Sequence, residues 1–334
     1  MKKILFLLLT AALLISCDRN IVSYDQYNVA LLINEGNDGN LNITGFNEDD
    51  MVYEDYSLRE SNDTPLEGEL QGIFIDDSSV GFLLTSDPDA LATVSLSQFK
   101  IMEKSILFDL QRPTAYCFAS SNLYILNRGE HPADTSFVSV YSTNGYKFVT
   151  KIDNINQGGN AIYVDRLFTY IGGKNGIEMY GNTSRTLDYT IEAPAEVMEF
   201  IPTMSNSIIV SLKDYGVGIF DTNSRKFKKI IEVPVGPKGR IVYGTSNTTL
   251  LTYSGDNVYL VDLESETYTT FHKGFQISGV GRSSNTKRVY VSEYKGDTMV
   301  ILDSKGNEIE RLSKNQPGDY SYIFSTRVIE TPVK

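Results

Sequence analysis

The feature that most restricts how this chain can fold is a repeat of about 40 residues that runs along most of its length. Each copy holds two short apolar runs joined by a polar turn, as in VSVYSTNGYKFVTK and NVYLVDLESETYTT. The last apolar residue before the turn falls at Phe46, Leu96, Tyr141, Tyr180, Phe220, Val261 and Leu302, with spacings of 50, 45, 39, 40, 41 and 41 residues. Such a period is typical of proteins built from repeated structural units.

Two further apolar runs precede each hairpin, as TAYCFAS and LYILNRGE do in the third copy. No long segment carries apolar residues at helical spacing, which indicates strands nearly throughout. Four antiparallel strands in each period are the pattern of a β-propeller blade. The sequence therefore predicts an all-β fold, a seven-bladed β-propeller.

The two ends of the repeat region predict how the ring closes. The first copy lacks an innermost strand, because VALLINEG already resembles a second strand. At the other end, DYSYIFSTRV (319–328) resembles an inner strand with no blade after it. We expect blade 1 to take three strands from the N-terminus and one from the C-terminus, a 3+1 closure that leaves no open edge.

The N-terminus predicts a lipid anchor. Lys2 and Lys3 precede an apolar run of roughly 12 residues, which is too short to span a bilayer and is typical of a secretory signal. The residues that end this run, LISC, resemble the bacterial lipobox, in which the cysteine, here Cys17, is acylated. The expected organisation is a lipoprotein signal peptide (1–16), lipidated Cys17 with a short tether (17–27) and a single propeller (28–330).

Composition argues against several functions. The formal net charge of −12 opposes binding to nucleic acid or to anionic lipid surfaces. His131 and His272 are the only histidines, too few for a histidine-rich metal site, and the Trp-containing Asp box of hydrolytic propellers is absent because the chain has no Trp. Cys117 lies in the apolar run AYCFAS, which predicts a small buried thiol. We expect no enzyme activity, no cofactor and no metal.

Ligand-binding candidates come from one face of the predicted ring. In a propeller, the turns between strands two and three and the linkers between blades open on the same face, around the axis. The candidates there are Asn37, Asp38, Arg112, Arg128, His131, Asn160, Asp214, Tyr215, Arg240, Tyr253, Tyr294 and Tyr320. Tyrosine suits recognition because it offers a flat apolar face with a polar tip.

The segment LLINEGNDGNLNITGFN, soon after the lipobox, resembles the start of the YncE-like seven-bladed propeller lipoproteins of Bacteroidetes. The run YILNRGE in the third copy fits the same pattern. This resemblance implies a monomeric outer-membrane lipoprotein that captures vitamin B12 or a related corrinoid for a TonB-dependent transporter. It implies exposure at the cell surface, with a periplasmic orientation as the alternative.

Two other functions stay open from sequence alone. One is a scaffold whose acidic ring docks another envelope protein, and the other is a lactonase or lyase. The role of the polar segment 59–72, as a lid or as a plain surface loop, also stays open.

Overall fold

The computed structural model describes residues 26–35, 40–58, 61–62, 66–75, 80–96, 99–105, 109–129, 135–155, 158–203, 205–236, 239–244, 246–314 and 319–329. These residues form strands joined by turns and loops. None of the described segments is a helix with the length and hydropathy needed to span a bilayer.

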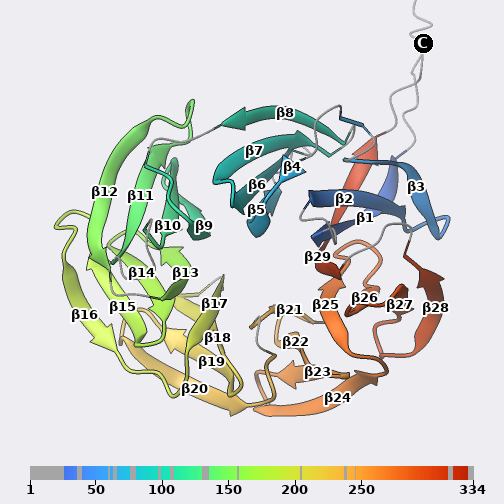
Figure 1. Cartoon of the computed structure of the whole chain (residues 1–334). Helices are drawn as coiled ribbons and strands as arrows, with labels where there is room; N and C mark the ends of the chain where they lie inside the picture. Colours follow the sequence, from blue (N-terminus) through green and yellow to red (C-terminus); the bar gives the residue numbers. More distant parts are fainter. Residues whose placement is uncertain are drawn as a thin grey trace, which may run out of the picture.

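Seven antiparallel sheets stand around a central axis as the blades of a closed ring (Figure 1). This confirms the predicted all-β, seven-bladed propeller. From the axis outward, blade 2 is β5 (Glu69–Ile75), β6 (Val80–Ser86), β7 (Ala90–Ser95) and β8 (Lys100–Ser105); blade 3 is β9 (Pro113–Ala119), β10 (Asn122–Asn127), β11 (Ser136–Ser142) and β12 (Phe148–Ile155); blade 4 is β13 (Gly159–Val164), β14 (Phe168–Gly173), β15 (Gly176–Gly181) and β16 (Leu187–Ile191).

The other blades follow the same order. Blade 5 is β17 (Val197–Pro202), β18 (Ser207–Leu212), β19 (Gly216–Asp221) and β20 (Lys226–Glu232); blade 6 is β21 (Ile241–Tyr243), β22 (Thr249–Ser254), β23 (Asn257–Asp262) and β24 (Thr267–Lys273); blade 7 is β25 (Ile277–Arg282), β26 (Val289–Glu293), β27 (Thr298–Leu302) and β28 (Glu308–Ser313).

Blade 1 closes the ring with strands from both ends of the chain. Its order from the axis is β29 (Asp319–Ile329), β1 (Gln26–Glu35), β2 (Asn40–Asn47) and β3 (Val52–Ser57). Strand β29 pairs antiparallel with β1 along the full length of β1, and Val29 lies opposite Thr326. The predicted 3+1 closure is confirmed.

Seven hydrophobic clusters among the described residues each join two successive blades, and the last joins blade 7 to blade 1. Strand β18 shows how: Ile208 and Val210 pack against blade 4, whereas Ile209 packs against blade 6. Because the middle strands are buried on both faces, their sequences are continuous apolar runs and not alternating ones. The apolar residues that define the repeat, Phe46 to Leu302, are each no more than 2% exposed.

The segment 59–72 contributes a strand to blade 1. Strand β3 pairs with the Thr44–Asn47 part of β2 and leaves the start of β2 without an outer neighbour. The short strand β4 (Leu66–Glu67) fills this place, since Leu66 pairs with Leu41 and is buried. This part of the segment therefore completes a sheet edge.

A buried carboxylate also holds blade 1 to blade 7. Glu48, in the hairpin after β2, is fully buried. Its carboxylate accepts hydrogen bonds from the hydroxyls of Ser283 (2.8 Å), Thr286 (2.7 Å) and Tyr290 (2.6 Å), and its main-chain carbonyl accepts one from the Arg288 guanidinium. Burial, followed by the charge of Glu48, raises the pKa of Tyr290, so this hydroxyl stays a donor.

We predict that Glu48→Gln lowers the free energy of unfolding by about 2 kcal/mol, because the amide replaces one acceptor oxygen with a donor that faces buried hydroxyls. Urea unfolding of purified protein measures this. Asp49→Asn is the control, since Asp49 is the exposed neighbour of Glu48 in the same hairpin. Equal stability of the two variants would contradict a role for Glu48 at the seam.

Candidate functional site

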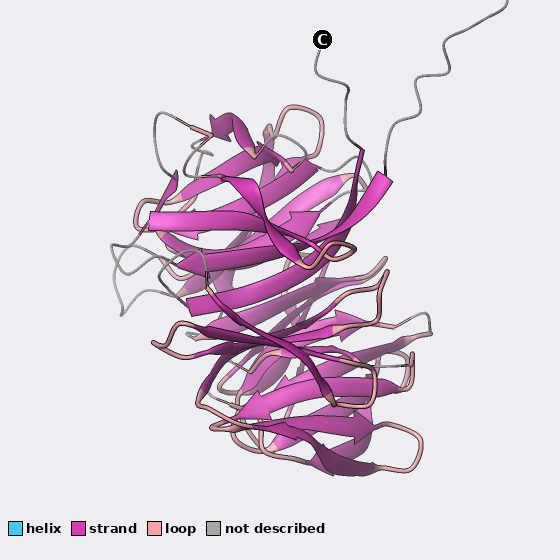
Figure 2. Ribbon diagram, turned by 90° about the vertical axis from the view of Figure 1, so that its right-hand side faces the viewer, coloured by secondary structure: helices cyan, strands magenta, loops and turns pink. Residues whose placement is uncertain are grey.

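The alternating direction of the strands sorts the loops onto two faces of the ring. Loops between the second and third strands of a blade, together with the linkers between blades, lie on one face, which we call the mouth face. Loops between strands one and two and the outer hairpins lie on the other, which we call the hairpin face. Figure 2 shows the blades from the side, with loops along both faces.

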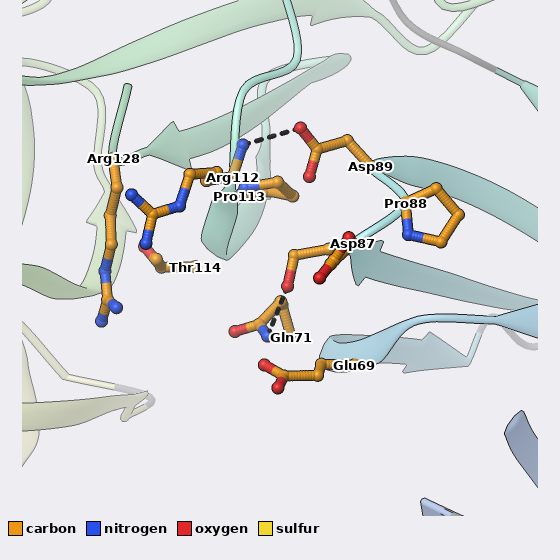
Figure 3. A pocket seen from close by; sticks show the side chains of 10 residues that line it. Glu69, Gln71, Asp87, Pro88, Asp89, Arg112, Pro113, Thr114 and Arg128 are labelled. Atoms are coloured by element: carbon orange, nitrogen blue, oxygen red, sulfur yellow. Dashed lines mark hydrogen bonds between the residues drawn. The ribbon is translucent and has the colours of Figure 1, made fainter. Parts of the chain in front are cut away.

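A cavity of about 630 Å³ opens on the mouth face between blades 2 and 3. It is formed by the start of β5, the β6–β7 turn, the start of β9 and the end of β10. The lining residues are Glu69, Gln71, Ser86, Asp87, Pro88, Asp89, Arg112, Pro113, Thr114 and Arg128. Figure 3 shows the guanidinium groups of Arg112 and Arg128 on one side of this space and the carboxylates of Glu69 and Asp87 on the other.

Main-chain contacts fix the wall of the cavity. The carboxylate of Asp89 accepts a hydrogen bond from the main-chain N–H of Arg112 (2.8 Å), and the carbonyl of Arg112 accepts one from the N–H of Arg128 (3.2 Å). Gln71 donates to the Ser86 hydroxyl (2.9 Å). Asp89 therefore ties the turn of blade 2 to the linker that carries Arg112.

Two of the lining residues have an uncommon backbone conformation. Asp87 has a φ of 52° and Arg112 a φ of 45°, in the left-handed region that non-glycine residues seldom adopt. Both therefore direct their side chains from tight bends and not from regular strands.

A chain of polar contacts leads from the cavity around the mouth face. Arg128 donates to the amide oxygen of Asn160 in blade 4 (3.3 Å), and the Asn160 amide donates to Glu196 in the next linker (2.9 Å). Glu196 forms an ion pair with Lys213 of blade 5 (3.5 Å). Of the predicted candidates, Arg112, Arg128 and Asn160 thus come together.

Arg240 forms an ion pair with a residue of an inner strand. Its guanidinium lies 3.4 Å from the carboxylate of Glu199 on the inner strand β17, and the N–H of Ile241 donates to the same carboxylate (3.0 Å). The Glu199 side chain is 25% exposed. Burial among protein atoms disfavours its charged form and raises its pKa, and the opposing attraction of Arg240 is the smaller effect.

Two of the predicted tyrosines, Tyr253 and Tyr215, are hydrogen-bonded to other residues of the ring. Tyr253 is 6% exposed and donates from its hydroxyl to the carbonyl of Ser278 in blade 7 (2.7 Å), so it packs between blades. Tyr215, beside the exposed Asp214, donates to Glu232 (3.0 Å), and this bond raises its pKa.

Tyr294 is 40% exposed in the turn after β26, with the Lys295 ammonium 5.2 Å from its ring centre. The remaining candidates cannot be placed: Cys17, Asn37, Asp38 and His131 lie outside the described residues, and of Tyr320 only the strand position in β29 is described.

The cavity also contains residues that were not among the predicted candidates, chiefly Glu69, Gln71 and Thr114 at the starts of inner strands. The available signal is polar side chains at the first positions of a strand that otherwise reads as buried, as in ELQGIFI and PTAYCFA. Position within the blade, and not residue type, marks them as mouth residues.

The thiol of Cys117 is half-buried, and burial raises its pKa to about 11. A thiol with this pKa is almost wholly protonated near neutral pH and is a poor nucleophile. Within the described part of the chain, no group of three or more His, Cys, Asp or Glu side chains is placed to hold a metal ion.

Comparisons with known proteins support the fold alone. No family model matches this sequence, and no curated protein matches it. Among solved structures, a chain of hydrazine synthase from Kuenenia stuttgartiensis is similar, with a TM-score of 0.57 and 13% sequence identity. The match covers 82% of this chain and 99% of that chain. At this identity the likeness shows a shared propeller architecture.

The raised pKa of Glu199 predicts a pH-dependent stability. Its carboxyl binds a proton more tightly in the folded chain, so folding stability falls as pH rises above the ordinary Glu pKa of 4.5 through the raised value. Glu199→Gln carries no charge at any pH. We therefore expect the variant to match the unmodified protein near pH 4 and to become more stable than it towards about pH 8.

Urea unfolding at several pH values checks this, with Glu192→Gln, at an exposed position in the linker before β17, as the control. A variant that becomes less stable than the unmodified protein as pH rises would show that the attraction between Glu199 and Arg240 outweighs the effect of burial.

Proposed function

We propose that this protein is a non-enzymatic, lipid-anchored binding protein that captures a nutrient at its mouth face. The proposed nutrient is a corrinoid such as vitamin B12, and the proposed receiver is a TonB-dependent outer-membrane transporter. The resemblance of LLINEGNDGNLNITGFN and of the lipobox to YncE-like propeller lipoproteins motivates the choice of nutrient and of receiver.

The observation that carries the proposal is the cavity between blades 2 and 3. Its volume of about 630 Å³ lies within the range of small-molecule sites, roughly 300–1,000 Å³. Its walls offer guanidinium, carboxylate, amide and hydroxyl groups, which suit a ligand rimmed with polar arms. A corrinoid is a wide ring of this kind, and its amide arms can both donate and accept hydrogen bonds.

The positions of the chain ends also support capture. Glu35 pairs with Asp319 at the mouth-face end of the β1–β29 ladder, whereas Gln26 pairs with Ile329 at the opposite end. Both ends of the ring therefore lie on the hairpin face. The eight residues between Cys17 and Gln26 let the chain reach at most about 30 Å, so this tether would hold the ring by the face opposite the cavity.

Titration with cyanocobalamin in a calorimeter tests the ligand. We expect saturable heat at one site per chain with a dissociation constant of about 1 μM or tighter, and coloured ligand that stays with the protein on gel filtration. Absence of heat and of retained colour would overturn the corrinoid assignment. A protein partner that co-purifies without any transporter would favour the scaffold alternative instead.

The anchor is tested by Cys17→Ser in the full-length chain. We expect loss of labelling by palmitate and release of the protein from the membrane fraction, because two or more acyl chains are needed for stable anchoring. Cys117→Ser is the matched control and should keep both the label and the membrane association. Retention of Cys17→Ser in the membrane fraction would contradict lipidation at this cysteine.

A further inference from the structure

The charged groups in the cavity are not paired with one another. The Asp89 carboxylate accepts a hydrogen bond from the main-chain N–H of Arg112. The guanidinium of Arg128 donates to the neutral amide of Asn160. In the described part of the chain, the side chains of Arg112, Glu69 and Asp87 make no hydrogen bond and no ion pair within 4.0 Å. One cavity thus holds cationic and anionic groups that do not neutralise each other.

The cationic and the anionic groups come from different blades. Arg128 is drawn toward blade 4 by the contacts that lead through Asn160 to Glu196. Arg112 and Asp87 leave tight bends on different blades, and Asp89 fixes the distance between those bends. Glu69 and Asp87 belong to blade 2, whereas Arg112 and Arg128 lie next to strands β9 and β10 of blade 3, so the two sets of exposed charges lie on opposite sides of the space (Figure 3).

The two sides of the cavity have different hydrogen-bonding chemistry. A guanidinium is a planar set of donors that matches the oxygens of a carboxylate or a phosphate. An ionised carboxylate only accepts, so Glu69 and Asp87 suit ammonium or amide N–H groups. Since the whole chain is acidic, with a formal net charge of −12, these two arginines provide local attraction for an anion that the rest of the molecule repels.

We propose that this cavity selects a ligand that carries an anionic oxygen group, carboxylate or phosphate, close to N–H donors. Arg112 and Arg128 bind the anionic group, and Glu69 and Asp87 bind the donors. The proposal rests on the capture function proposed above for the same site. A corrinoid with its nucleotide loop has this chemistry, because a phosphodiester stands beside amide arms.

Two related ligands test the arginine side and the carboxylate side of the cavity separately. Cyanocobalamin has both the phosphodiester and the amide arms, whereas dicyanocobinamide keeps the ring and its amides but lacks the phosphodiester. For the full-length protein in detergent at low salt, we expect cyanocobalamin to bind at least about tenfold more tightly. The double variant Arg112→Gln/Arg128→Gln should lose about 10- to 100-fold for cyanocobalamin and little for dicyanocobinamide.

The variant Glu69→Gln/Asp87→Asn should weaken both ligands by a similar factor, because both carry the amides. Arg166→Gln, at an exposed position on the hairpin face, is the control and should change neither. All of these positions except Asp87 and Arg112 have ordinary backbone angles, and circular dichroism verifies that each variant is folded. Equal affinity for the two ligands, or an arginine variant that binds cyanocobalamin normally, would overturn the proposal while leaving corrinoid capture intact.

If neither corrinoid binds, the proposed nutrient is wrong. Simpler probes then test whether the cavity binds an anionic group close to N–H donors. Glycylglycine, which carries a carboxylate and an ammonium group, and inorganic phosphate are then titrated while thermal unfolding is followed. We expect both to raise the melting temperature of the unmodified protein, and neither to raise that of the arginine double variant. Absence of any shift for the unmodified protein would overturn the proposal as well.

Discussion

Ten residue pairs of the ladder between β1 and β29 join the two ends of the chain, and the rest of the structure depends on this contact. A propeller blade cannot bury both of its faces alone, so each blade needs a neighbour on each side, and a hydrophobic cluster forms between each pair of neighbours. Without β29, blade 1 would lose its innermost strand and the ring would open at the seam. The buried Glu48 adds a second fastening there, on the hairpin face, through donors from blade 7.

Closure also explains why a site can form at the mouth face. The middle strands are committed to packing on both sides, as Ile208 and Ile209 show by contacting opposite neighbours. The loops at the ends of the strands carry no such obligation, and they can vary without disturbing the core. Arg112, Asp87 and Arg128 all lie on such loops or at strand ends.

The charged residues of the mouth face differ in whether they form ion pairs. Lys213 and Arg240 are satisfied by Glu196 and Glu199, and these pairs link blades to one another. The side chains of Glu69, Asp87 and Arg112, between blades 2 and 3, make no such pairs among the described residues, and this is why we propose their cavity as a binding site. The same ring therefore contains charged residues that form ion pairs and charged residues that do not, and residue type alone does not separate them.

The sequence by itself determined the architecture, because a blade is a local unit whose four strands and turns are written within about 40 consecutive residues. Even the closure could be predicted, since a missing first strand and a surplus last strand are visible in VALLINEG and DYSYIFSTRV. Only the tertiary structure decided which mouth residues meet. Tyr253 packs between blades, and Arg240 forms an ion pair with Glu199. Arg112, Arg128 and Glu69 line one cavity. These contacts join different blades, so they depend on the spacing and rotation between blades and on side-chain direction, neither of which a pattern along one strand encodes.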